Sequence, residues 1–119
     1  MSEFIPTFIE DALGLKTGIS IDNVRVLVDR DNDCITITGR MAAGAKYYTS
    51  FEFEPEIEAD LLNSENQVCL SATSNHEGCV AASQKISFLL RFSSISKYVS
   101  WSEIRKIEVY VIFKHLSSI

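Results

Sequence analysis

Apolar and polar residues alternate along most of this chain, and the longest alternation is YYTSFEFEPEIEADLL at residues 47–62. Successive side chains of a strand point to opposite faces. The pattern therefore predicts a strand with one apolar face against a core. The other face carries a column of carboxylates: Glu52, Glu54, Glu56, Glu58 and Asp60.

Pro55 lies inside this alternation. Proline cannot donate a ladder hydrogen bond, so it belongs on a sheet edge, at a bulge, or where a strand crosses between sheets. A single strand of this length would also be unusual. We therefore expect two strands, at about residues 46–54 and 56–62, and exposed strand edges beside Pro55 that could pair with another chain.

Five further runs read as strands. They lie at about residues 19–28, 34–38, 67–73, 86–92 and 107–114. The first changes parity at Asp22-Asn23, which predicts a bulge or a break. The turn formers of residues 29–33 join the first two runs into a hairpin. The run at 86–92 is the most apolar, and we expect it to be a central strand.

The Ser/Thr-x-x-Glu spacing of a capping box occurs at residues 7–10 and again at 100–103. The first predicts either a short helix over about residues 8–13 or an irregular arm pinned by Phe4, Phe8 and Leu13. The second predicts a single helical turn near residues 100–104.

About seven short strands with almost no helix indicate an all-β fold, an antiparallel β-sandwich. We expect an N-terminal arm or short helix at residues 1–18, the sandwich domain at 19–114, and a frayed end at 115–119. A PH-like, partly open barrel is the alternative fold, but that fold ends in a long helix and this sequence predicts a final strand.

The order of these runs resembles immunoglobulin-like modules of the FxLYD kind over about residues 19–114. The resemblance rests on Ile37-Thr38-Gly39, on Leu61-Leu62-Asn63 before a polar turn, and on two later runs, FLLRF at 88–92 and IEVYV at 107–111. It implies an immunoglobulin-like binding or structural module. It carries over no catalytic residue.

Composition narrows the classes of partner. The 119 residues carry 11 Lys and Arg against 16 Asp and Glu, a net charge of −5, and 46% are hydrophobic. This acidic balance argues against a nucleic-acid partner and against anionic membranes. Cys34, Cys69 and Cys79 are odd in number and lack a CxxC pair, which favours reduced thiols. With no apparent secretion signal, we expect a cytoplasmic protein.

Seven residues form a candidate interaction face. They are the carboxylates of the column together with two tyrosines on the polar parity of their strands: Glu52, Glu54, Glu56, Glu58, Asp60, Tyr48 and Tyr110. Neighbouring carboxylates on a strand face lie about 7 Å apart, which is wide for a shared metal without further ligands. A solvated face is the main expectation, and docking of a basic partner, metal binding and catalysis are the alternatives.

Two other groupings suggest chemistry less specifically. Asp29-x-Asp31-x-Asp33 imitates the start of a calcium loop but lacks its glycine and its closing glutamate, so we interpret it as a turn. His76, Glu77 and Cys79 share one loop, without the further ligands of a zinc site or the third group of a catalytic triad.

The sequence therefore predicts a non-catalytic β-sandwich, without a cofactor, that acts by protein contact or by self-association. One alternative is a small-molecule or carbohydrate binder with an aromatic-lined pocket. Another is a metal-dependent hydrolase that uses the carboxylates of residues 52–60.

Overall fold

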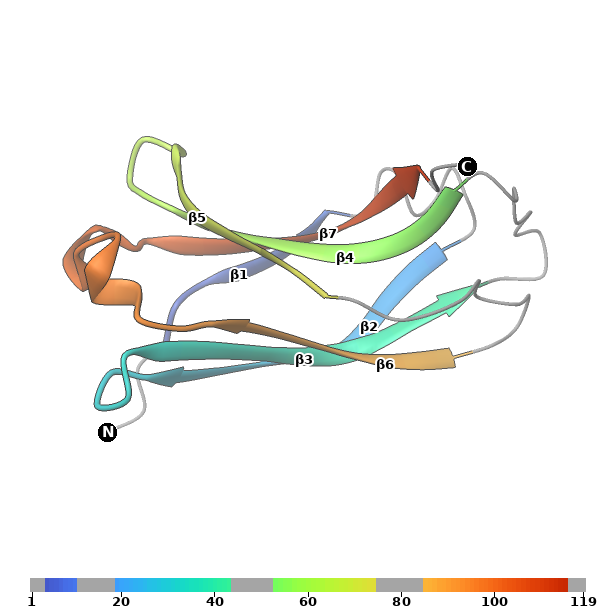
Figure 1. Ribbon diagram of the computed structural model, residues 1–119, viewed down its shortest axis with the longest axis horizontal. Helices are drawn as coiled ribbons and strands as arrows, with labels where there is room; N and C mark the ends of the chain where they lie inside the picture. Colours follow the sequence, from blue (N-terminus) through green and yellow to red (C-terminus); the bar gives the residue numbers. More distant parts are fainter. Residues whose placement is uncertain (1–3, 11–18, 44–52, 75–84, 116–119) are drawn as a thin grey trace.

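Two β-sheets pack face to face in the computed structural model, which describes residues 4–10, 19–43, 53–74 and 85–115 (Figure 1). Within these residues the helical elements are two 3-10 turns, η1 (Ile95–Lys97) and η2 (Trp101–Glu103). The strands are β1 (Thr7–Glu10), β2 (Ile19–Asp29), β3 (Cys34–Ala43), β4 (Phe53–Leu62), β5 (Val68–Thr73), β6 (Lys85–Phe92) and β7 (Lys106–His115). The prediction of an all-β fold is confirmed.

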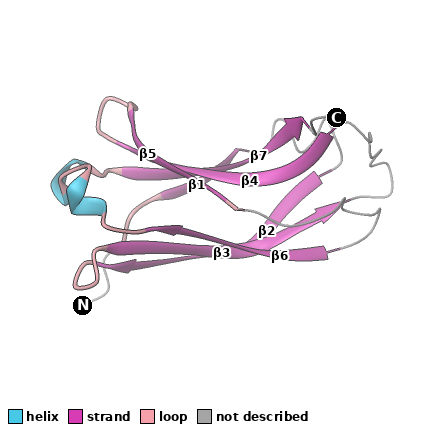
Figure 2. Ribbon diagram, viewed as in Figure 1, coloured by secondary structure: helices cyan, strands magenta, loops and turns pink. Residues whose placement is uncertain are grey.

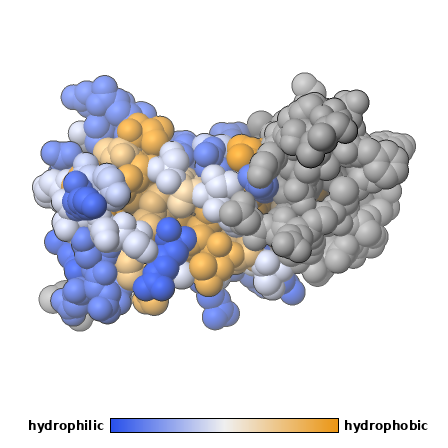
Figure 3. All heavy atoms as spheres, in the orientation of Figure 1, coloured by the Kyte–Doolittle hydropathy of each residue, from blue (hydrophilic) through white to orange (hydrophobic). Residues whose placement is uncertain are grey.

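The four-stranded sheet has the order β1-β7-β4-β5 and the three-stranded sheet has the order β2-β3-β6. Every neighbouring pair is antiparallel except β1 and β7, which run parallel. Apolar side chains gather along the seam between the two layers on the side that Figure 3 shows, with polar side chains above and below.

The core is made by the inward parity of the central strands, as the two-residue period predicts. Fully buried or nearly buried side chains come from both sheets: Ile35, Ile37, Met41, Ile57, Ala59, Leu61, Phe88, Leu90, Phe92, Ile107, Val109 and Val111. Their burial removes apolar surface from water, which is the main favourable term in folding.

The predicted hairpin between β2 and β3 is confirmed, with a tight turn at residues 30–33. Its register shifts between Asp22 and Arg25, where Asn23 has a φ of 54°. This bulge restores the inward parity, so that Ile19 and Ile21 before it and Val26 after it all face the other sheet.

The prediction that the chain divides near Pro55 is wrong. β4 is one strand that passes through Pro55, which lies opposite Phe113 of β7. Two residues later, the Ile57 N–H donates to Ser74 Oγ on the β5 side, and β5 itself starts to pair only at Glu58. By the alternation of a strand, Pro55 N points to that same side, beyond the end of β5, so no hydrogen bond between the described strands is lost.

The predicted helix at residues 8–13 is wrong for residues 8–10, which belong to β1, and residues 11–13 lie outside the described part of the chain. The arm alternative also needs correction. Phe4 and Phe8 do not pin the segment, because they are 85% and 54% exposed. Backbone pairing with β7 holds it instead, from Thr7 opposite Ile107 to Glu10 opposite Tyr110.

The expectation that residues 86–92 form a central strand is also wrong. β6 pairs with β3 alone among the described strands and ends its sheet. Its apolar alternation reflects inward Phe88, Leu90 and Phe92, whereas Leu89 on the outer face is 60% exposed.

The turn predicted near residues 100–104 is confirmed as η2, without the capping-box hydrogen bonds. The Ser100 hydroxyl contacts Ser102 Oγ at 3.0 Å instead. His115 is the last residue of β7, and the rest of the predicted frayed end lies outside the described residues.

Asp33 ties the β2–β3 turn to η1 and η2 at one end of the sandwich (Figure 2). Its Oδ1 accepts from Ser96 N at 3.0 Å and from Trp101 Nε1 at 2.8 Å, and its Oδ2 accepts from Ser96 Oγ at 2.6 Å. The Ile95 N–H donates to the Asp33 carbonyl, and the Arg30 guanidinium lies 5.3 Å from the Trp101 ring centroid. The aspartates of residues 29–33 thus shape a turn, as predicted.

Replacing Asp33 with asparagine is expected to lower the melting temperature at neutral pH by several degrees. Bonds from Ser96 and Trp101 lower the pKa of Asp33, so its contribution to stability is present above the ordinary carboxyl pKa of about 3.9 and is lost as pH falls through the lower folded value. Fluorescence of Trp101, the single tryptophan, reports unfolding from pH 2 to 7. The wild type and the variant should converge at the acid end, and a constant difference would contradict this role.

Candidate functional site

Three residues of the predicted interaction face lie together on the outer face of the four-stranded sheet. Tyr110 of β7 lies opposite Glu58 of β4, and its hydroxyl donates to Glu58 Oε2 and to Asp60 Oδ2, the latter at 2.8 Å. Asp60 Oδ1 accepts from Ser71 Oγ of β5 at 2.6 Å. The cluster therefore connects three adjacent strands.

The expectation of a solvated carboxylate column is wrong for two of its members, since Glu56 is 6% and Asp60 7% exposed. Glu58 and Tyr110 are half-buried. Tyr48 and Glu52 lie outside the described residues, and Glu54 is placed in β4 without a described side chain. Part of the column thus supports the sheet through its bonds to Tyr110 and Ser71.

Burial and the two carboxylates raise the pKa of the Tyr110 hydroxyl well above its usual range. The hydroxyl therefore stays protonated and acts as a hydrogen-bond donor. A phenol carries one proton, which the two carboxylate oxygens share. This geometry fits a structural bridge between β4 and β7.

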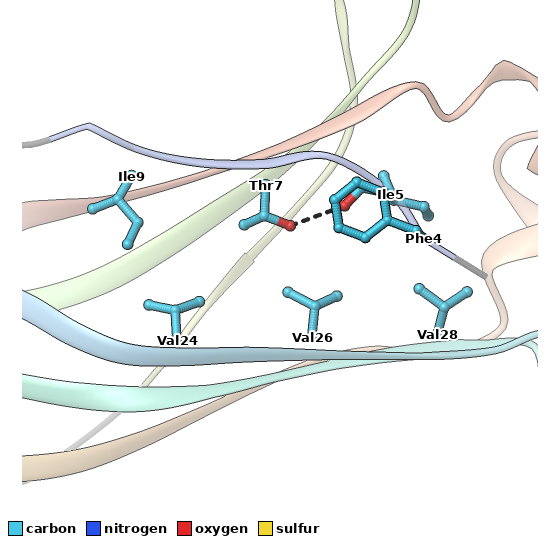
Figure 4. Close-up of a pocket in the computed structure, with 7 residues that line it drawn as sticks. All are labelled: Phe4, Ile5, Thr7, Ile9, Val24, Val26 and Val28. Carbon is cyan, nitrogen blue, oxygen red and sulfur yellow. Dashed lines mark hydrogen bonds between the residues drawn. The ribbon is translucent and has the colours of Figure 1, made fainter. Parts of the chain in front are cut away.

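A second site lies at the lateral edge where β1 covers β2. An apolar cleft of about 290 Å³ opens there. Figure 4 shows Ile9, Thr7 and Ile5 from the β1 side facing three valines of β2 across the gap. The full lining is Phe4, Ile5, Thr7, Ile9, Val24, Val26 and Val28.

The cleft follows from short side chains at the edge of the sandwich. Stacked sheets lie about 10 Å apart, and filling that space takes large side chains. Here valines from β2 meet Thr7 and Ile9 from β1, whereas the centre of the sandwich has leucine, isoleucine and phenylalanine. The edge therefore remains open and apolar.

Exposed apolar side chains surround this edge. Phe4 is 85% exposed and Phe8 54%, and Leu27 on the outer face of β2 is 65% exposed. Sequence reasoning placed Val24, Val26 and Val28 in a strand but did not identify them as a binding surface. The three valines alternate with polar or exposed residues, which is the pattern of any half-buried strand.

Two of the three cysteines lie within the described residues. Cys34 is buried and Cys69 half-buried, and both are free thiols. Burial raises the pKa of the Cys69 thiol, which keeps it in the less nucleophilic protonated form. The predicted grouping of His76, Glu77 and Cys79 lies outside the described residues.

Over residues 4–10, 19–43, 53–74 and 85–115, no group of three or more His, Cys, Asp or Glu side chains is arranged to hold a metal ion. None of the helical segments in those ranges has the length and apolarity to cross a membrane. The chain matches no family model, and no curated protein or solved structure is significantly similar to it.

Proposed function

We propose that this protein is a non-catalytic β-sandwich that binds another protein chain along the β1–β2 edge. One observation carries the proposal: an apolar cleft opens beside a strand that, within the described residues, has a hydrogen-bonded neighbour only on its β3 side. An extended segment placed along β2 would continue the sheet through backbone hydrogen bonds and would direct alternate side chains into the cleft.

Three properties of the edge support this mode of binding. β2 is eleven residues long, so it offers more backbone groups than the four-residue β1. Alternate N–H and C=O groups of an edge strand point away from its neighbour. Leu27, Phe4 and Phe8 provide exposed apolar surface beside these groups, and such surfaces mark sites of protein contact.

The strand order supports an immunoglobulin-like classification as part of the same proposal. In such sandwiches one sheet has the central order C-F-G and the other contains A, B and E. If β2, β3 and β6 correspond to A, B and E, then β4 and β7 correspond to C and F. β1 then occupies the place of the last strand G, parallel to β7.

Selection of peptides tests the proposal. From a random library of 12-residue peptides, the immobilised protein is expected to select extended sequences with apolar residues at alternate positions. Leu27→Asp should weaken binding of the selected peptides about tenfold or more, because a charge would lie beside the added strand. Leu89→Asp is the matched control, since Leu89 is 60% exposed on the outer face of the same sheet but lies on β6. Equal effects of the two substitutions would refute the proposed edge.

A second candidate is binding of a small apolar molecule in the cleft, which is supported by its mainly aliphatic lining with Phe4 as the one aromatic residue. This lining suits an alkyl chain better than a sugar, because sugar sites need polar groups that fix orientation. Binding of a fluorescent fatty acid to the wild-type protein, and loss of that binding in a folded Val26→Asp variant, would support this candidate.

A further inference from the structure

We propose that the chain bound along β2 is a second copy of this protein, and that two β2 strands pair antiparallel about a two-fold axis at Leu27. The inference rests on the proposed contact at the β1–β2 edge. It adds the identity of the partner and the register of the pairing.

The segment Arg25-Val26-Leu27-Val28-Asp29 is complementary to itself when one copy is reversed. With Leu27 opposite Leu27 of the second copy, Arg25 faces Asp29 of that copy, and the symmetric pair repeats the contact. Opposite charges directly across an antiparallel pair stabilise it, and long side chains reach across the gap of about 5 Å between Cβ atoms. Both charged residues lie on the outer parity with Leu27, and Arg25 is exposed.

Only this register matches the charges. A two-fold axis perpendicular to the sheet keeps the inward residues of both copies on the same face. Outer residues therefore pair only with outer residues, and one copy can shift along the other only in steps of two residues. The adjacent registers place Leu27 opposite Arg25 or opposite Asp29. The next registers place Arg25 opposite Arg25, or Asp29 opposite Asp29, and both repel.

The inward side of this pairing matches as well. Val26 of one copy lies opposite Val28 of the other, on the face that lines the cleft. β1 covers β2 at the same edge (Figure 4), so a copy that pairs along β2 also approaches β1, where Phe4 and Phe8 are exposed. The bulge at Asp22 to Arg25 limits regular pairing to the segment after it.

The other edge strands lack this complementarity. Pairing of β6 with itself about Leu89 would place Ser87 opposite Arg91, which provides no ion pair. β5 carries no charged residue, and β1 has four residues. Charge complementarity therefore selects β2 among the edges of the described sheets.

Sedimentation equilibrium with two opposite charge reversals tests the inference. The wild type is expected to dimerise with a dissociation constant of roughly 10 µM to 1 mM, as suits a small contact. Arg25→Asp and Asp29→Arg should each weaken the homodimer by about tenfold or more, because each turns two attractive pairs into two repulsive ones. An equimolar mixture of the two variants should dimerise again, since every pair across the contact then joins opposite charges.

Arg105→Asp is the control for net charge, because it removes an exposed arginine away from β2. Asp29 also accepts bonds from Asn32 in the turn, so circular dichroism must show that Asp29→Arg is folded. If that variant does not fold, Leu27→Asp replaces it: two carboxylates would meet on the axis and the homodimer should be lost, while Leu89→Asp should leave it intact.

A monomeric wild type at millimolar concentration would overturn the inference, and so would a dimer that neither reversal weakens, or single reversals that the mixture does not restore. If selected peptides still bind at Leu27, these outcomes contradict the homodimer but not the proposed function. Loss of peptide binding at that edge refutes the proposed function itself.

Discussion

Gly39→Ala is expected to reduce the free energy of unfolding by roughly 1–3 kcal/mol, the usual cost of overpacking a core. A Cβ at this position would lie 2.6 Å from Cζ and 2.7 Å from Cε2 of Phe88, and 3.2 Å from the Asp22 carbonyl oxygen. Phe88 is 6% exposed and packs in the core cluster, so its ring has little room to move. Because Gly39 of β3 has no side chain, the ring of Phe88 from the neighbouring strand β6 can pack directly against it.

Urea unfolding followed by circular dichroism measures this effect. Phe88→Leu alone should also destabilise the fold, because it leaves a cavity. The double variant should be more stable than the sum of the two changes predicts, because the smaller side chain gives room to the new methyl group. Thr38→Ala, on the outer face of the same strand, is the control and should have a small effect. Additive effects of Gly39→Ala and Phe88→Leu would contradict the proposed clash.

Tyr110→Phe is expected to reduce the free energy of unfolding by about 1–3 kcal/mol, the usual contribution of hydrogen bonds to charged groups. The substitution removes the hydroxyl that donates to Glu58 and Asp60. Asp60, which is 7% exposed, would keep its bond from Ser71 but lose the one from β7. Glu58 would likewise lose its bond from Tyr110.

Tyr98→Phe is the matched control, because Tyr98 is 64% exposed and its hydroxyl has no hydrogen-bond partner within the described residues. A double-mutant cycle of Tyr110→Phe with Asp60→Asn isolates the coupling between the two side chains. A coupling energy near zero, or equal losses for the two tyrosines, would show that the hydroxyl does not bridge the strands.

The two-residue alternation was sufficient to find most of the strands, because burial of one face imposes that period on any half-buried strand. It placed β2, β5, β6 and β7 to within one residue at each end and identified inward residues of the core, such as Ile57 and Val109. It ended β3 too early, at residue 38, because the small residues that follow suggest a loop, whereas the strand continues to Ala43.

Local signals failed where distant pairing decides the outcome. Thr7 to Glu10 has the spacing of a capping box, yet β1 is extended because it pairs with β7, about one hundred residues later. Pro55 predicts a break in the strand, but the side of its missing N–H points beyond the end of β5. The apolar content of β6 suggested a central strand, although sheet order depends on topology and not on the composition of one strand.

The candidate sites were predicted in part. The parity of Tyr110 placed it on the polar face with the carboxylates, but its bonds to Glu58 and Asp60 depend on the register between β4 and β7. Arg25 and Asp29 were visible in the sequence as an arginine and a turn residue. That Arg25 of one copy can pair with Asp29 of another matters only if β2 is an edge strand, which the sequence does not show.

The most direct test of the central claim, that contact occurs along the β1–β2 edge, is a map of backbone amide shifts by NMR. Spectra are recorded while the wild-type protein is titrated with a selected peptide, and again over a dilution series. We expect the largest shifts at residues 5–9 and 24–29, with β5 and β6 unchanged. Shifts centred on β5, on β6 or on the Tyr110 face would contradict it.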